Sequence, residues 1–122
     1  MNPSHPKIVF FLLALLMLVG TGCKKNEDTV PNVEVNMVIS TTDPEFNDLN
    51  AVGGWIYLLG GSRGIVVYRP SLDEFMAYDR HCPYMPSEAC GIVEVDQSEV
   101  IAEDPCCGSK FILTDGTVAE GP

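Results

Sequence analysis

Short apolar segments alternate with clusters of turn-forming residues along the chain from residue 33 onward. Residues 33–40, VEVNMVIS, carry apolar side chains at every second position, which predicts a half-buried strand. In residues 41–50, Asp43 comes directly before Pro44, a pair typical of a helix cap and first helical position. The pattern therefore predicts a strand, followed by a turn or one short helix.

Further strands are predicted where apolar or β-branched residues lie between glycine, proline or polar turn residues. These segments are residues 53–61, 65–70, 75–79, 92–95, 99–102 and 110–114. Asp115 and Gly116 form a dipeptide typical of a hairpin turn. Short strands at close spacing predict one all-β domain, a small antiparallel sandwich or barrel. We expect its core to contain Trp55, Tyr57, Phe75 and Phe111, and its solvated strand ends to include Arg63 and Arg69.

Two loops interrupt this pattern and contain four of the five cysteines. The first, residues 80–91, RHCPYMPSEACG, has two prolines and no apolar period, and the second is residues 103–109, EDPCCGS. If residues 92–95 and 99–102 pair as a hairpin, the flanking loops leave it at the same end. This pairing would place Cys82 and Cys90 beside Cys106 and Cys107.

The first 23 residues have the features of an export signal. Lys7 precedes an apolar run, residues 8–20, which is shorter than the roughly 20 residues of a membrane span. The following GTGC resembles a bacterial lipoprotein signal, in which the cysteine, here Cys23, becomes the acylated first residue. The alternative is a plain signal peptide with an incidental cysteine. We expect residues 1–22 to be the signal, 23–32 a tether, and 33–122 the domain.

Export and charge limit the classes of partner. The lipid would anchor the protein to a bacterial membrane, at a periplasmic or outer-membrane face, where disulfides persist. The formal net charge is −10, and cleavage that removes Lys7 makes it −11. This acidity argues against nucleic acid, whose binding depends on lysine and arginine, and against direct contact with anionic lipid headgroups.

Four clustered cysteines have three possible roles. Cys106 and Cys107 are too close to bond to each other, because adjacent α-carbons lie about 3.8 Å apart and disulfides need about 4.4–6.8 Å. Two bridges between the loops are one possibility, and a bridge from Cys82 to Cys107 would contribute about 3–4 kcal/mol. A zinc site with four thiolates is a second, and redox-active thiols are a third.

The two loops and their flanking strands resemble a Rieske-type domain over roughly residues 34–122. The resemblance rests on GIVVYRPSLDEFMAYDRHCPY, residues 64–84, and DPCCGSKFILTDGTVAEGP, residues 104–122. Rieske domains are small antiparallel β folds that transfer electrons through a [2Fe–2S] cluster, held by Cys-x-His and Cys-x-x-His. The resemblance also implies a further closing strand, so we expect that the chain is truncated after AEGP.

The ligand positions depart from the family pattern. Cys82 stands at the first cysteine position, but Tyr84 stands at the first histidine position. Asp104 and Cys107 stand at the second cysteine and second histidine positions. His81 is one residue out of register, so we expect a surface histidine there. Near the loops, the carboxylates of Asp79, Glu103 and Asp104 could form a site, but we expect them to be surface charges.

The resemblance also implies a disulfide between the loops. Cys106 falls where some Rieske domains carry a non-ligand cysteine, and its partner position is Ser87 here, so Cys90 would serve instead. Cys82 and Cys107 would then face each other and could form a second bridge that closes the cluster site. We expect a non-enzymatic, disulfide-stabilised lipoprotein without a cofactor. The alternatives are a [2Fe–2S] electron carrier with unusual ligands and a zinc-stabilised module.

Overall fold

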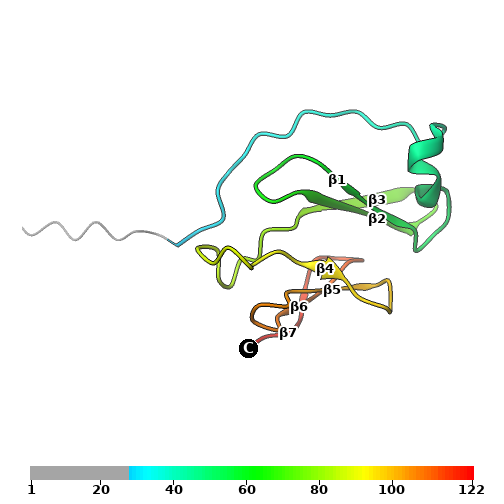
Figure 1. The fold of residues 1–122 in the computed structure, drawn as a ribbon. Coiled ribbons are helices and arrows are strands. Elements are labelled where there is room, and N and C mark those ends of the chain that lie inside the picture. Colours follow the sequence, from blue (N-terminus) through cyan, green and yellow to red (C-terminus); the bar gives the residue numbers. More distant parts are fainter. Residues whose placement is uncertain (1–27) are drawn as a thin grey trace, which may run out of the picture.

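The computed structural model describes residues 28–122 and shows two antiparallel sheets with very little helix (Figure 1). The predicted all-β fold is therefore confirmed.

The elements are a 3-10 helix, η1 (Pro44–Asn50), and the strands β1 (Trp55–Leu58), β2 (Ile65–Ser71), β3 (Glu74–Asp79), β4 (Glu94–Val95), β5 (Ile101–Glu103), β6 (Lys110–Ile112) and β7 (Val118–Glu120). The signal sequence and Cys23 lie outside the described residues. No helix within residues 28–122 is long and apolar enough to cross a membrane.

The three-stranded sheet has the order β1-β2-β3, with the long strand β2 in the centre. Val66 lies opposite Tyr57 on β1 and Tyr78 on β3, so the apolar centre of β2 is paired on both sides. Residues 65–68 of β2 are all buried, because both faces of this sheet are covered. The sequence run IVVY is a continuous apolar segment, as expected for a strand of this kind.

The four-stranded sheet has the order β4-β5-β6-β7, and its strands have only two or three residues each. The predicted hairpin is present, with Glu94 paired to Glu103 and Val95 to Ala102. The Asp115–Gly116 turn joins β6 to β7, and Gly116 has a φ of 74°, which favours glycine. Both hairpins lie where the turn residues predicted them.

The two faces of β2 support two separate cores. The face toward the four-stranded sheet forms a buried cluster of Val66, Tyr68, Cys82, Val93, Ala102 and Leu113. The opposite face forms a second cluster of Leu49, Ile65 and Val67, against which Ile39, Phe46, Ile56 and Leu58 pack. In Figure 1 the segment that leads to η1 passes over this outer side of the three-stranded sheet. The first cluster therefore joins the two sheets, and the second fixes the N-terminal segment and η1.

The prediction of a strand at residues 33–40 is wrong. The segment has no strand pairing, and most of its side chains are exposed, with Val38 96% exposed. Its apolar alternation arises because Val35, Met37 and Ile39 line a groove over the outer face of the three-stranded sheet. An extended segment laid on an apolar surface has the same period of two as a strand, so the pattern did not distinguish them.

The prediction of four core aromatic residues is partly wrong. Trp55 and Phe111 are half-buried and pack against the cluster between the sheets. Tyr57 and Phe75 are 39% and 45% exposed. Their rings are covered by arginines instead, with the Arg80 guanidinium 3.8 Å from the ring centroid of Tyr57 and that of Arg69 4.9 Å from Phe75.

Arg69 is not a solvated strand end, contrary to the prediction. Its guanidinium donates to the carbonyl oxygens of Leu49, at 2.9 Å, and of Asn50. It also donates to those of Ser71, the last residue of β2, and Leu72, which follows it. One arginine thus satisfies carbonyl groups at the end of η1 and at the β2–β3 turn. It fixes the helix against the three-stranded sheet.

Candidate functional site

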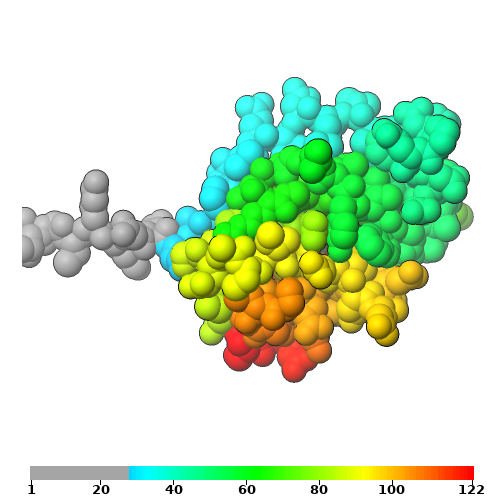
Figure 2. Space-filling model, viewed as in Figure 1, coloured from blue at the N-terminus to red at the C-terminus, as the bar shows by residue number. Residues whose placement is uncertain are grey.

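The four cysteines of the two loops gather at one end of the molecule, as the hairpin pairing predicted. The first loop is closed at its base by an isolated antiparallel β-bridge between His81 and Ile92. A hydrogen bond from Cys82 N–H to the carbonyl oxygen of Gly91 lies beside it. Figure 2 shows the first loop, in yellow and yellow-green, directly beside the second loop, in orange. The site is therefore built from two loops that share one hairpin.

Arg63 holds the first loop in place and is not a solvated strand end. Its guanidinium donates to three carbonyl oxygens of that loop, those of Pro86, Glu88 and Gly91. The carboxylate of Asp79 fixes the turn that carries Arg63, because it accepts bonds from the backbone N–H groups at residues 62 and 63. Asp79 is thus a structural acceptor and not a free surface charge.

His81 is buried, with 6% of its surface exposed, so the prediction of a surface histidine is wrong. Its Nε2 lies 2.7 Å from the carbonyl of Pro86, and its Nδ1 lies 2.7 Å from the hydroxyl of Ser62. A carbonyl only accepts, so Nε2 carries the proton and, in the neutral ring, Nδ1 accepts from Ser62. His81 therefore joins the first loop to the β1–β2 turn and takes no part in the thiol cluster.

Cys90 and Cys106 form a disulfide between the loops, with their α-carbons 5.6 Å apart. This is the pairing implied by the resemblance, with Cys90 in place of Ser87. The bridge joins residues separated by 16 positions, and a loop of this size contributes about 3 kcal/mol in the chain-entropy model. Because both cysteines are used, a zinc site with four thiolates is excluded for this structure.

Cys82 and Cys107 remain free, and their sulfur atoms lie 3.9 Å apart. The second bridge that sequence analysis suggested is therefore not formed. The Cys107 thiol instead donates to Asp104 Oδ2, at 3.3 Å, and lies 3.1 Å from the Ser109 hydroxyl. Cys82 is fully buried and Cys107 is half-buried.

Asp104 is fully buried at the centre of this cluster, so the prediction of a surface charge is wrong for this residue. Its carboxylate accepts from Cys106 N–H, at 2.8 Å, and from the Cys107 thiol, and the Cys82 sulfur lies within 4.8 Å of it. Burial raises the pKa of Asp104, but these hydrogen bonds outweigh burial and the net pKa lies below its ordinary value. The second loop therefore holds a charged carboxylate that is satisfied by its own neighbours.

Burial and, to a smaller extent, the nearby Asp104 carboxylate together raise the pKa of the Cys82 thiol to about 11. The backbone N–H groups of Tyr84 and Met85 act in the opposite direction, with a smaller effect. Cys82 is therefore a protonated hydrogen-bond donor at neutral pH. A thiol in this state is a poor nucleophile, which argues against thiol redox catalysis at this site.

Of the four residues that the Rieske resemblance places at cluster-ligand positions, three have their ligand atoms close together and one does not. The ligand atoms of Cys82, Asp104 and Cys107 all lie within 4.8 Å of one another, whereas Tyr84 is 59% exposed. A [2Fe–2S] cluster needs four ligands and room for two irons and two sulfides between the loops. The 3.9 Å contact between the two sulfur atoms fills this space. The residues present do not fit such a cluster.

Sequence analysis missed Ser109, which is buried and contacts Cys107. It also missed Ser62, which bonds to His81. Serine is common in turns, so neither residue carried a signal of its own in the sequence.

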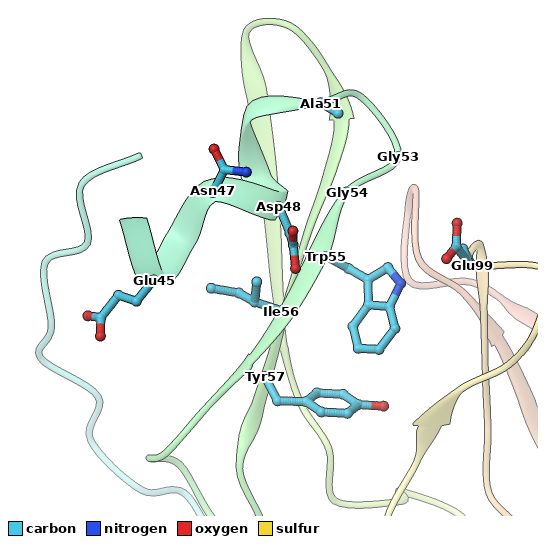
Figure 3. Close-up of a pocket in the computed structure, with 10 residues that line it drawn as sticks. All are labelled: Glu45, Asn47, Asp48, Ala51, Gly53, Gly54, Trp55, Ile56, Tyr57 and Glu99. Carbon is cyan, nitrogen blue, oxygen red and sulfur yellow. The ribbon is translucent and has the colours of Figure 1, made fainter. Parts of the chain in front are cut away.

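A second hollow, of about 690 Å³, lies between η1, β1 and the loop that carries Glu99. Figure 3 shows Trp55 and Tyr57 on one side of β1, with Glu45 pointing away from them and Glu99 on a separate loop. The carboxylates in this hollow do not converge on a common point. Tyr57 already accepts a bond from Val95 N–H at 2.8 Å and so joins the two sheets. This hollow has the form of a surface depression and not of a chemical site.

Comparison with known proteins adds no relative: the chain matches no protein-family model, no curated protein and no solved structure.

Proposed function

We propose that the chain is an exported, lipid-anchored bacterial protein whose Rieske-like domain has lost its cluster and serves as a non-enzymatic module. The loops that would hold the cluster are joined covalently to each other through Cys90 and Cys106. The position of the cluster is filled by the protein's own thiols and carboxylate. The domain thus keeps a rigid tip of two loops without the electron-transfer centre that the resemblance implies.

The single observation that carries this proposal is the contact between Cys82 and Cys107. The sulfur atoms of these two thiols lie 3.9 Å apart. The neighbouring Asp104 carboxylate is fully buried and accepts a hydrogen bond from the Cys107 thiol. Buried polar groups that satisfy one another are stable without a further ligand. An electron carrier instead needs a cofactor at this place.

Export is supported by the disulfide and by the N-terminal sequence. Structural disulfides persist in oxidising compartments and are rare in the bacterial cytosol. The apolar run at residues 8–20 and the GTGC sequence that ends in Cys23 are the features that direct and anchor such a protein. The Cys90–Cys106 disulfide and the N-terminal signal sequence therefore both support a location outside the cytosol.

The test of the proposed function is iron and sulfide analysis of the protein purified anaerobically from its membrane, together with its visible absorption spectrum. The expected result is neither iron nor acid-labile sulfide and no visible absorption, both as isolated and after incubation with ferrous iron and sulfide. Two irons and two sulfides per chain would overturn the proposal and return the [2Fe–2S] electron carrier to first place.

The lipid anchor is tested by Cys23→Ser, which removes the acylated thiol and leaves the domain unchanged. We expect wild type in the membrane fraction and the variant in the soluble exported fraction. Cys107→Ser is the control, because it also removes a cysteine but should leave the protein in the membrane fraction. The anchor is refuted if Cys23→Ser remains membrane-bound to the same extent as wild type.

A further inference from the structure

Two of the three distances among Cys82, Asp104 and Cys107 are close to the edges of a tetrahedron around a single metal ion. With zinc–sulfur bonds of about 2.3 Å and zinc–oxygen bonds of about 2.0 Å, two sulfur ligands lie about 3.8 Å apart, and sulfur and oxygen about 3.5 Å apart. The structure has 3.9 Å between the two sulfur atoms and 3.3 Å between Cys107 Sγ and Asp104 Oδ2. The third pair, Cys82 and Asp104, has its ligand atoms within 4.8 Å of each other, so the three groups surround one common space.

The framework holds these three groups rigidly. Cys106, the residue before Cys107, is bonded to Cys90 in the other loop, so the disulfide keeps Cys107 against Cys82. Asp104 is fixed by a tight turn, in which Gly108 N–H donates to the Asp104 carbonyl at 2.7 Å and Asp104 N–H donates to Ser109 at 2.9 Å. A ligand set that is already positioned loses little conformational entropy when it binds.

A zinc ion takes cysteine ligands as thiolates, and both Cys82 and Cys107 can supply one because neither belongs to the disulfide. Cys82 and Asp104 are fully buried, so two thiolates and a carboxylate would be costly there without a cation. A divalent ion would supply that positive charge.

From this geometry we infer that Cys82, Asp104 and Cys107 form a mononuclear zinc site. Zinc accepts sulfur and oxygen ligands in a tetrahedron, whereas the carboxylate makes the set unsuited to monovalent copper. On binding, the ion replaces the two thiol protons, which pass to solvent, and Asp104 enters already ionised. Water or the Ser109 hydroxyl, 3.1 Å from Cys107 Sγ, takes the fourth position.

The test uses the full chain with Cys23→Ser, purified anaerobically with its disulfide intact and freed of metal with a chelator. Free thiols are counted first, and zinc is then titrated in competition with a chromophoric chelator. Cobalt is added in a parallel titration, because tetrahedral cobalt bound to thiolates has strong visible and charge-transfer absorption. Titration calorimetry in buffers of different ionisation enthalpy counts the protons released.

We expect two free thiols, one zinc per chain, two protons released per zinc, and a cobalt spectrum of a tetrahedral thiolate site. Cys107→Ser should weaken zinc binding by more than about 100-fold, and Asp104→Asn by at least about 10-fold. Glu103→Gln is the matched control, because it removes a carboxylate next to Asp104 that is not in the cluster, and it should bind zinc as wild type does.

Three results would overturn the inference: no stoichiometric zinc binding, binding that survives in Cys107→Ser, or a second disulfide in place of the two free thiols. Cys107 is half-buried, so its replacement tests the site even if a Cys82 variant fails to fold. Failure to bind zinc leaves the proposed cluster-free module standing. Iron and sulfide at this site would instead overturn both proposals.

Discussion

The two sheets of this domain are held together by different means. The three-stranded sheet has a central strand of seven residues, pairs each neighbour over several positions and is buried on both faces at residues 65–68. The four-stranded sheet has strands of two or three residues, and all three residues of its edge strand, β7, are exposed. Its loops are stabilised by a disulfide, an arginine that binds three carbonyls, and a buried carboxylate.

This difference explains where the candidate site lies. Apolar burial stabilises the first sheet without special residues, so that sheet can act as a scaffold. Most residues of the two loops are exposed or half-buried, and the loops are held by polar and covalent links, which also place chemical groups close together. The same residues that hold the loops, above all Asp104 and the four cysteines, are therefore the residues of the site. If the two sheets depend on different interactions, substitutions in one should leave the other largely unchanged.

Removal of the disulfide by Cys90→Ser with Cys106→Ser should lower the free energy of unfolding by about 3 kcal/mol. The loss should concentrate in the four-stranded sheet, because the bridge joins its two loops. Urea denaturation measures the total, and hydrogen exchange of backbone amides shows its distribution. Cys107→Ser removes no disulfide, so it should lower the free energy of unfolding by less than the double variant does. Equal loss of amide protection in both sheets would contradict the comparison.

Val66→Ala should lower the free energy of unfolding by about 2 kcal/mol, because it removes two buried methyl groups from the cluster between the sheets. Val38→Ala is the same chemical change at a side chain that is 96% exposed, and it should stay within about 0.5 kcal/mol of wild type. Denaturant unfolding of both variants measures the difference. If the two variants were equally stable, β2 would not be the common support of both sheets.

Asp104→Asn should lower stability at neutral pH by about 1–2 kcal/mol, because hydrogen bonds to a charged acceptor are lost. The folded pKa of Asp104 lies below its unfolded value, so the unfolded chain binds the proton first as pH falls. Stability from Asp104 is thus complete above the unfolded pKa of about 4, and is lost as pH falls through the folded pKa.

The measurement for Asp104 is the free energy of unfolding between neutral and acid pH, in wild type and in Asp104→Asn. The difference between the two proteins should shrink as the pH falls. Asp73→Asn is the control, because Asp73 is an exposed carboxylate in the β2–β3 turn and lies outside the buried cluster. A difference that stays constant with pH would show that the buried carboxylate is not charged in the folded protein.

Arg63→Lys should have the smallest effect, about 1 kcal/mol or less, because lysine cannot bind three carbonyls at once. The change should be local and appear as faster hydrogen exchange of the Cys82 and Gly91 amides in the first loop. Arg69→Lys is the matched variant, since Arg69 binds several carbonyls at η1 and the β2–β3 turn. It should leave the first loop unchanged. Faster exchange of that loop in Arg69→Lys would show that the two regions are coupled.

The paired strands were predicted well from the sequence, because the order of apolar and polar residues in a strand follows directly from which side chains are buried. The run of residues 65–68 and the Asp115–Gly116 turn have few alternative structures, and both are found as expected. Residues 33–40 failed because an extended segment laid on a sheet repeats the pattern of a strand. The boundaries of β4 and β5 also differ, since short strands are limited by their loops more than by their own residues.

The candidate site was predicted in part. The cysteine cluster followed from one hairpin, and the Cys90–Cys106 pairing followed from the resemblance. The buried state of His81 and Asp104 did not, because both depend on contacts with residues distant in the sequence or on turn geometry. Arg63 is the clearest example, since its three acceptors lie more than 20 residues away and are backbone atoms, which leave no trace in side-chain patterns.

The most direct test of the cluster-free, singly bridged site is a count of cysteine states in the Cys23→Ser chain. The protein is purified anaerobically from the exported fraction, denatured without reductant, alkylated and weighed, and its iron and acid-labile sulfide are measured. The structure predicts two alkylated cysteines, Cys82 and Cys107, one disulfide and neither iron nor sulfide. Four alkylated cysteines, or two irons and two sulfides per chain, would contradict this account of the site.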